Sequence, residues 1–274
     1  IIALVIPDIR NQFFTSLARG VEDVASKYEY RVMLCNTDED TDKQRGYVDT
    51  FRSKIVDGFI ISVASERDKC LGRVNRQSLP FVLIDRLCKG VSADAVIVDN
   101  KDGAFKAVSH LLQLGHRRIG LIGGKSDTLT GRERLRGYRD AYRTLGMECD
   151  REIIKDGGFT IEGGYRATKA LLDLKNCPTA LFIANNAMTI GSLKALAEAK
   201  VKIPDEMSVI GFDDSDWAEF FAPPLTVVRQ PPYSMGTLAG EILFQRILGE
   251  GPRDWQEVVL RPELIIRSSC KPVS

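Results

Sequence analysis

The chain has 274 residues, a formal net charge of +1, 27% charged residues and 44% apolar residues, which is the composition of an ordinary globular protein. This balance excludes the Lys and Arg surplus expected of a chain that binds nucleic acid by itself. No apolar run reaches the roughly 18 residues that a membrane-spanning helix needs. The length is sufficient for one large domain or two ordinary ones.

Strand and helix patterns alternate through the first 99 residues. Short apolar runs closed by polar or turn-forming residues predict strands, and apolar positions at helical spacing predict the helices between them. The predicted strands are 1–6, 31–35, 58–63, 81–84 and 95–98, and the predicted helices are 14–28, a polar helix that ends at Lys54, and 66–77.

The alternation then repeats in the rest of the chain. The predicted helices are 104–114, 132–145, 161–174, 187–199 and 234–248, and the predicted strands are 119–122, 180–183, 209–211, 258–260 and 264–266. Gly115 and Gly146 follow two of these helices and are predicted to end them. The repeat indicates an α/β protein with two similar halves, largely parallel sheets and a break near Asp99-Asn100. No linker rich in Gly, Pro or Ser separates the halves, which favours strands that cross between them.

The six cysteines are scattered and form no Cys-x-x-Cys pair. In a chain of this size they indicate free thiols in a reducing compartment, so we expect a cytoplasmic protein. The first residue is Ile and begins a strand directly. Together with the free thiols, this favours a preceding domain over a removed signal peptide.

Polar and aromatic residues follow most of the predicted strands. The carboxyl ends of parallel strands meet at one edge of a sheet, and ligands of open α/β folds bind there. Two half-sites are therefore predicted, one from Asn11, Phe13, Phe14, Asp85 and Arg86, and one from Arg134, Phe159, Asn185, Asp213 and Gln230. Their amides, carboxylates and guanidinium groups hydrogen-bond hydroxyls, and phenyl rings pack on the C–H face of a sugar. The set suits a small ligand rich in hydroxyl groups.

Simpler roles remain open for several of these residues. Asp85 and Asp213 are alternatively helix N-caps or loop residues, and Asp214 is more readily a cap for the turn at 217–221. Phe13 and Phe14 are alternatively core residues at the start of a helix. The predicted helix that carries Arg134 also carries Arg132 and Arg136. These two residues are predicted to form an exposed helix face.

No feature of the chain demands catalysis, and no catalytic residue, metal or cofactor is predicted. Asp213 and Asp214 are adjacent on a turn, where side chains point in different directions, and no second carboxylate pair accompanies them. His110 and His116 are six residues apart, which is not the spacing of a metal pair on a helix. The glycine-rich segment 120–125 matches neither a Walker loop nor a dinucleotide fingerprint and predicts a tight turn after a strand.

Several segments, in this order and spacing, resemble the effector-binding core of the LacI/GalR family of bacterial transcription regulators, which is similar to periplasmic sugar-binding proteins. The resembling segments are Ile6-Pro7-Asp8-Ile9-x-Asn11-x-Phe13-Phe14, Asn36-Thr37-Asp38, Val82-Leu83-Ile84-Asp85-Arg86, Val98-Asp99-Asn100, Leu114-Gly115-His116-Arg117-Arg118-Ile119, Arg134-x-x-Gly137-Tyr138, Val209-Ile210-Gly211-Phe212-Asp213-Asp214 and Glu263-Leu264-Ile265-Ile266-Arg267. One departure is Asn186, which stands where the family usually has Asp.

The resemblance implies a periplasmic binding protein type I fold: two lobes, each a mainly parallel sheet flanked by helices, joined by crossover strands. On that pattern residues 1–99 and 231–257 form the N-terminal lobe, and 100–230 and 258–274 the C-terminal lobe. An effector occupies the cleft and contacts the ten half-site residues named above. Family members usually form homodimers and bind operator DNA through a small helix-turn-helix domain, which we expect to precede this chain.

The leading hypothesis is therefore a regulator's sensor domain, in which a sugar or related polyol controls operator affinity. The alternative is a periplasmic sugar-binding protein of a transporter, and an enzyme is a third hypothesis that no residue demands. A purine corepressor or a phosphoprotein partner also remains open. Asp85 and Asp213 favour a neutral ligand, because two carboxylates repel an anion.

Overall fold

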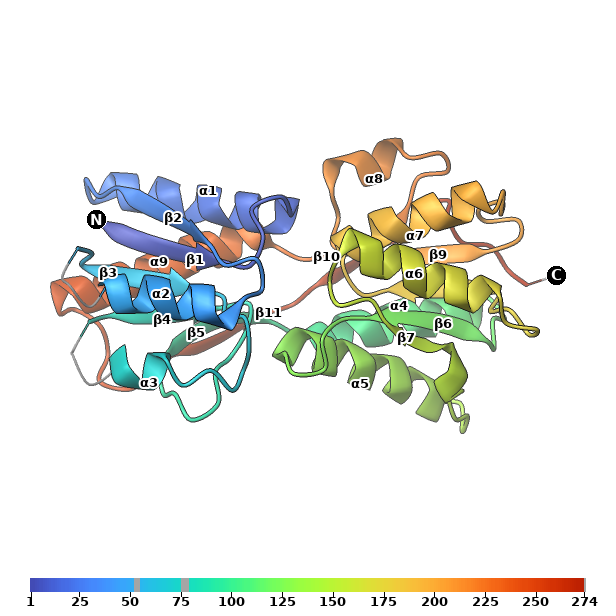
Figure 1. The fold of residues 1–274 in the computed structure, drawn as a ribbon, viewed down its shortest axis with the longest axis horizontal. Coiled ribbons are helices and arrows are strands. Elements are labelled where there is room, and N and C mark those ends of the chain that lie inside the picture. The colour runs from blue at the N-terminus through green and yellow to red at the C-terminus, as the bar shows by residue number, and fades with distance from the viewer. Residues whose placement is uncertain (52–54, 75–78, 274) are drawn as a thin grey trace. The chain divides into compact units, whose positions relative to one another are not determined.

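The computed structural model describes residues 1–51, 55–74 and 79–273, and the chain divides into two compact units (Figure 1). The first unit contains Ile1–Val98, Asp127–Leu129 and Pro231–Leu260, and the second contains Asp99–Ser126, Thr130–Gln230 and Arg261–Ser274. Each unit has one six-stranded, mainly parallel sheet, which confirms the predicted fold class.

The sheet of the first unit has the strand order β11-β5-β4-β3-β1-β2, and every neighbouring pair is parallel. Its strands are β1 (Ile2–Ile6), β2 (Val32–Asn36), β3 (Gly58–Ile61), β4 (Phe81–Ile84), β5 (Asp94–Val98) and β11 (Glu257–Leu260). Its helices are α1 (Gln12–Lys27), α2 (Thr41–Phe51), α3 (Leu71–Val74) and α9 (Pro232–Leu248).

The core of the first unit lies on both faces of this sheet. All five residues of β1 are buried, as in a parallel sheet with both faces covered. Successive side chains point to opposite faces, so Ile2, Leu4 and Ile6 pack with α1 and α9. Ala3 and Val5 pack on the other face with residues of α2 and α3.

Helices α1 and α9 approach each other closely at two glycines. A Cβ atom on Gly20 would lie 2.3 Å from the carbonyl oxygen of Tyr233, and one on Gly236 would lie 2.1 Å from that of Leu17. Both positions therefore require glycine, and this contact ties the N-terminal helix to a helix more than 200 residues later in the chain.

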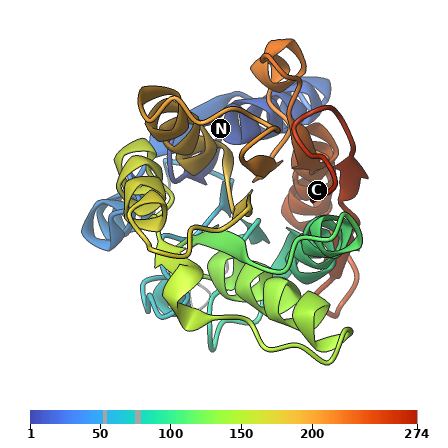
Figure 2. The same ribbon diagram turned by 90° about the vertical axis from the view of Figure 1, so that its right-hand side faces the viewer.

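The sheet of the second unit has the order β12-β10-β9-β8-β6-β7, with β12 antiparallel to β10 and the other pairs parallel. Its strands are β6 (Ile119–Gly123), β7 (Ile154–Asp156), β8 (Ala180–Ile183), β9 (Ser208–Phe212), β10 (Thr226–Arg229) and β12 (Glu263–Ile265). Its helices are α4 (Asn100–Gln113), α5 (Leu129–Arg143), η2 (Arg151–Ile153), α6 (Ile161–Leu172), α7 (Asn186–Glu198) and α8 (Asp216–Phe220). Figure 2 shows this unit end-on, with α4 and α5 (greens) on one face of the sheet and α6 and α7 (yellow to brown) on the other.

The structure differs from the predicted elements at several places, among them η2 and α8, which were not predicted. Strands β7 and β10 were not predicted, because each is short and has few apolar residues at alternating positions. The predicted boundary between the two lobes at 257/258 is wrong for residues 258–260. These residues belong to β11, which pairs with β5 in the sheet of the first unit. The helix predicted over 66–77 is reduced, within the described residues, to α3, and 75–77 lie outside them together with 52–54.

The loss of helix before α3 has a local cause at Asp68. Its carboxylate accepts hydrogen bonds from the backbone N–H of Cys70 at 2.9 Å and from the side-chain amide of Gln44 at 2.8 Å. A side chain that bonds the backbone two residues on stabilises a turn at the expense of a helix. Gly115 and Gly146 have φ values of 91° and 66° and lie in the turns that follow the last residues of α4 and α5, Gln113 and Arg143, which confirms that they end these helices.

Candidate functional site

Two aspartates occupy equivalent places at the carboxyl ends of β4 and β9. Asp85 and Asp213 have φ values of 66° and 82°, a conformation that a non-glycine residue adopts rarely and at some cost. Each donates its backbone N–H to the neighbouring strand at 2.9 Å, Asp85 to Val96 and Asp213 to Val228. Neither caps a helix, because Asp99 caps α4 and Ser215 stands at the N-cap of α8, so the capping alternative is wrong.

In the first unit, the carboxylate of Asp85 is surrounded by internal partners. The residue is 4% exposed. The hydroxyl of Ser62 lies 3.4 Å from its Oδ2, and Nε of Arg86 lies at the same distance from that oxygen. The charge of Asp85 is therefore already balanced within the unit.

Arg86 is held by a second carboxylate that the sequence did not reveal. Its guanidinium donates to both oxygens of Glu39 at 2.7 and 2.8 Å, and to the carbonyl oxygen of Val63 at 3.1 Å. Burial alone would lower the pKa of Arg86, but the carboxylates of Glu39 and Asp85 outweigh it and raise the pKa above its usual value. The structure thus gives this predicted ligand residue an internal role: it joins the end of β4 to the loop after β2.

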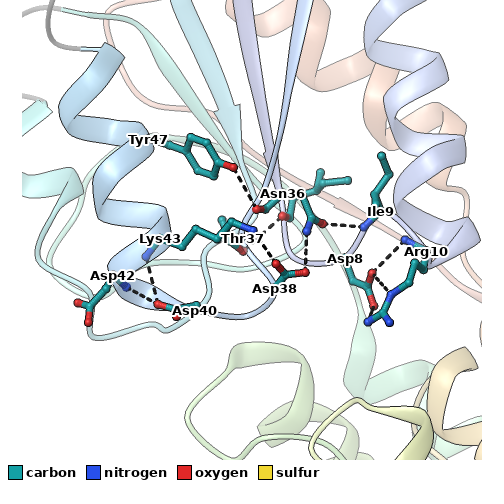
Figure 3. A network of polar contacts seen from close by, with 11 residues as sticks. Asp8, Ile9, Arg10, Asn36, Thr37, Asp38, Asp40, Asp42, Lys43 and Tyr47 are labelled. Carbon is teal, nitrogen blue, oxygen red and sulfur yellow. Dashed lines mark hydrogen bonds and ion pairs between the residues drawn. The ribbon is translucent and has the colours of Figure 1, made fainter.

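A polar network orders the loops after β1 and β2 at the same edge (Figure 3). The side chain of Asn36 accepts from the backbone N–H of Ile9 at 2.8 Å and donates to Asp38 at 2.7 Å. Asp38 in turn accepts from Lys43, and this bond lowers the pKa of its carboxyl group. The network fixes the loop that leads into α1.

The remaining predicted residues of the first unit lie at the start of α1. Asn11 is the N-cap, and its side-chain oxygen accepts from the backbone N–H of Phe13 at 3.1 Å. Phe13 and Phe14 are 7% and 5% exposed, pack edge to face with ring centroids 4.9 Å apart, and belong to the core. For these two rings the structure supports the core alternative.

In the second unit, the carboxylate of Asp213 is surrounded by amide groups. Its Oδ2 accepts from the backbone N–H of Asn186 at 3.1 Å, and its Oδ1 accepts from the side-chain amide of Gln230. The side-chain oxygens of the same two residues are unsatisfied: Oδ1 of Asn186 and Oε1 of Gln230 are buried and have no hydrogen-bond partner within the described residues. Asn186 and Gln230 are only 6% and 5% exposed.

Arg134 and Asn185 are both anchored beside this cluster. The Arg134 guanidinium donates to Asn100 at 2.8 Å and to the carbonyl oxygen of Ala184, and it stacks 3.7 Å from the centre of the Phe212 ring. Asn185 caps α7, accepting from the backbone N–H of Met188 at 2.8 Å. Both side chains are therefore held in one orientation by protein contacts.

Phe159 packs against the glycine-rich turn that follows β6. Its φ is 63°, and its ring lies directly over Gly124, where a Cβ atom would come within 1.9 Å of the ring. The turn predicted for 120–125 therefore requires glycine at Gly124 because an aromatic ring covers the backbone.

Asp213 and its neighbour Asp214 bond different partners. Asp214 accepts two parallel bonds from Arg267 at 2.9 Å and another from Arg229 at 3.0 Å. It does not cap α8, so that interpretation is wrong, although its role is structural as predicted. Arg132 and Arg136 project from α5 with side chains 30% and 58% exposed.

Other chemistry has little support in the described part of the chain. No cluster there of three or more His, Cys, Asp or Glu residues is arranged to hold a metal ion. Burial lowers the pKa of His116, whose two ring nitrogens lie 2.8 Å from the Thr179 hydroxyl and 3.1 Å from the Ser208 hydroxyl. Burial raises the pKa of Cys70 to about 12 and that of Cys88 to about 11, which suppresses thiolate formation. None of the described helices is long and apolar enough to span a membrane.

Comparisons with known proteins agree with this geometry. Residues 108–270 match the model of the periplasmic binding protein-like domain family, so the fold and the strand-end site define a protein of that class. The chain is 34% identical over its full length to the HTH-type transcriptional regulator DegA of Bacillus subtilis (strain 168), and covers 81% of that protein. It is 31% identical to the HTH-type transcriptional repressor PurR of Haemophilus influenzae (strain PittEE), with 99% of this chain and 82% of that protein covered.

Solved structures extend the likeness. A LacI family transcriptional regulator from Enterococcus faecium with bound ribose matches with a TM-score of 0.90 and 30% identity, covering 100% of this chain and 99% of that one. The transcriptional regulator CelR in complex with cellobiose matches with a TM-score of 0.88 and 30% identity, covering 98% and 84%. The chain belongs to the LacI family of transcriptional regulators, and this confirms the interpretation as a regulator's binding domain and not an enzyme.

Proposed function

We propose that this chain is the sensor domain of a bacterial regulator and that it binds a small sugar-like effector at the strand-end site. The observation that carries the proposal is the pair of buried, unsatisfied side-chain oxygens of Asn186 and Gln230, two residues that both donate a hydrogen bond to Asp213 through other atoms. A buried acceptor without a partner costs about 1–3 kcal/mol. A ligand that donates to both oxygens removes that cost, and adjacent sugar hydroxyls are such donors.

The regulator relatives support a sensor over a transport receptor. The curated relatives that are about a third identical to this chain are transcriptional regulators, and the ribose and cellobiose complexes show that relatives of this fold bind sugars. We propose a cytoplasmic homodimer that reaches operator DNA through a helix-turn-helix domain. We propose that the regulator has two conformations that differ in their affinity for the effector. Effector binding then shifts the population between them and so changes operator affinity.

The ten predicted contacts do not carry equal weight in this proposal. In the second unit, Gln230, Asp213, Asn185 and Arg134 are the stronger candidates, and we add Asn186 because of its unsatisfied oxygen. Phe159 is proposed to offer its ring to the ligand. In the first unit, Asn11 and Asp85 are the stronger candidates, because Arg86 is engaged by Glu39 and the two phenyl rings belong to the core.

Calorimetric titration with pentoses, hexoses, disaccharides and nucleobases tests the proposal. The substitution Gln230→Leu keeps the side-chain volume but removes the oxygen, and we expect it to weaken sugar binding at least tenfold, or about 1.4 kcal/mol. Asp213→Asn should have a similar effect. Asn176→Ala, which removes an exposed amide elsewhere in the second unit, is the matched control and should bind like the wild type.

Two outcomes would contradict the proposal. If no sugar binds, or if Gln230→Leu binds as tightly as the wild type, the unsatisfied oxygens are not the effector site. Preference for a nucleobase over every sugar, with the same loss in Gln230→Leu, would keep the site and replace the ligand class. Operator binding by the full-length regulator with and without the selected ligand then tests the regulatory step.

A further inference from the structure

Helix α5 carries an exposed arginine face that the proposed effector site does not use. At 100° per residue, Arg132, Arg136, Arg139 and Arg143 fall within roughly 60° of the helix circumference. Arg134, which is 4% exposed, lies on the opposite side of the same helix. A ligand on the arginine face would therefore be separate from the groups around Asp213.

Two hollows flank this face and share Arg139 and Arg143. One, of about 280 Å³, is also lined by Met147, Glu148, Cys149 and Arg151. The other, of about 490 Å³, is also lined by Lys101, Glu133, Arg136 and Asp140. Small-molecule pockets occupy a similar range of roughly 300–1,000 Å³. Five cationic side chains and three carboxylates line the two hollows, so their charge is positive.

The pairing of these charges leaves two arginines available. Arg136 lies 2.6 Å from Glu133, and Asp140 lies 2.7 Å from Arg143 and 2.8 Å from Lys101. Arg139 and Arg151 form no such ion pair with any residue in the described ranges. A guanidinium is a planar fork of donors that matches phosphate oxygens, and it remains charged at any physiological pH.

We propose that the arginine face binds a small polyanion with two phosphate groups, one in each hollow, held between Arg139 and the arginines beside it. Arg139 lines both hollows and is the central contact, whereas Arg151 contacts only the group in the smaller hollow. The bound anion satisfies the two guanidinium groups that lack carboxylate partners. The site depends on neither Asp213 nor Gln230.

Titration of the whole chain with inorganic pyrophosphate at physiological ionic strength tests this site. We expect saturable binding of one pyrophosphate per chain, weaker binding of orthophosphate, and at least about a tenfold loss of affinity in Arg139→Gln and Arg151→Gln. Arg166→Gln removes the same charge from an exposed position on α6 and is the matched control, with unchanged affinity expected. Unfolding temperatures equal to that of the wild type verify that the variants are folded.

Several results would overturn the site. They are the absence of saturation at millimolar pyrophosphate, an equal loss in Arg166→Gln, or unchanged affinity in Arg139→Gln. Tighter binding of an acidic peptide than of pyrophosphate would assign the face to a protein partner instead. In Asp213→Asn, pyrophosphate binding should persist while sugar binding is lost, so this site and the proposed effector site succeed or fail separately.

Discussion

The carboxyl edges of the two sheets share a backbone design but differ in chemistry. Asp85 and Asp213 end equivalent strands with the same left-handed conformation and the same hydrogen bond to the neighbouring strand. Around Asp85 the partners are charged, because Arg86 lies between it and Glu39. Around Asp213 the partners are the backbone N–H of Asn186 and the side-chain amide of Gln230, and the side-chain oxygens of both residues have no bond within the described residues.

This difference separates a scaffold from a receptor surface. A guanidinium whose charge is balanced by two carboxylates gains little from a neutral ligand, whereas a buried acceptor without a donor gains a full hydrogen bond. The sheet edge around Asp85 is therefore expected to contribute mainly to the stability of the fold, and the edge around Asp213 mainly to the affinity for the ligand. Substitutions at each edge separate these two contributions. The fluorescence of the two tryptophans reports on the units individually, because Trp255 lies in the first unit and Trp217 in the second.

The largest effect is expected from Arg86→Met. This change leaves Glu39 and Asp85 without their cation, and breaking a buried pair costs about 3–5 kcal/mol. Urea unfolding, followed by Trp255 fluorescence in a Trp217→Phe background, measures the loss. The double variant Glu39→Gln with Arg86→Met should recover part of it, and a stability equal to that of the wild type in Arg86→Met alone would remove the scaffold role.

A smaller loss, of about 2 kcal/mol, is expected for Asp214→Ala. The carboxylate is 10% exposed, its partner Arg267 is 13% exposed, and two parallel charge-assisted bonds join them. Thermal unfolding monitored at Trp217 measures it. Asp213→Asn is the matched comparison: it should lose less stability and far more sugar affinity, and the reverse result would exchange the roles of the two residues.

The helix caps provide a comparison in which the two edges should behave alike. Asn11→Ala and Asn185→Ala each remove the side-chain acceptor for the first turn of a helix, which costs about 1 kcal/mol. Unfolding free energies of both variants test this. Sugar titration of the same proteins then shows whether either amide also contacts the ligand, since a cap without ligand contact leaves the affinity unchanged.

The smallest effect is a pH dependence that belongs to the second unit, which contains both histidines, His110 and His116. Burial lowers the pKa of His116 in the folded chain. As the pH falls below about 6.5, the unfolded chain therefore binds more protons than the folded one, and the free energy of unfolding decreases. Above that pH the contribution is fully present.

The pH effect is measured by comparing His116→Gln with the wild type between pH 7.5 and 5. The variant should lose less stability on acidification, with the difference seen at Trp217. Parallel pH profiles for the two proteins would show that His116 is not the responsible group.

The sequence predicted the strand ends well, since apolar runs that stop at a polar residue fix both the strand and the place of that residue. It did not predict the partners of those residues. Glu39 lies 47 positions from Arg86, and only the parallel packing of β2 beyond β1 and β3 brings the loop that carries it to the end of β4. Likewise, Asn186 stood out as a departure from the family, but neither the bond from its backbone to Asp213 nor its unsatisfied side-chain oxygen could be predicted from the sequence.

Short elements were the least predictable part of the fold. Strands β7 and β10 contain no apolar run longer than two residues, unlike most of the short strands that were predicted, and their place is set by the neighbouring strands. The segment before α3 has a helical composition, but Gln44 from another helix holds Asp68 in a turn. In both cases contacts between distant parts of the chain override local preference.

The packing of α9 against α1 has a consequence for synthesis. Met235, Leu243 and Phe244 of α9 belong to the same core as Ile2, Leu4 and Leu17. The first unit therefore stays without part of its hydrophobic core until the ribosome has passed residue 248, by which time nearly all of the second unit has emerged. Although domains commonly fold from the N-terminus onward during translation, the N-terminal unit of this protein is not expected to be completed before most of the second unit has been made. We expect its exposed sheet face to bind chaperones in the meantime.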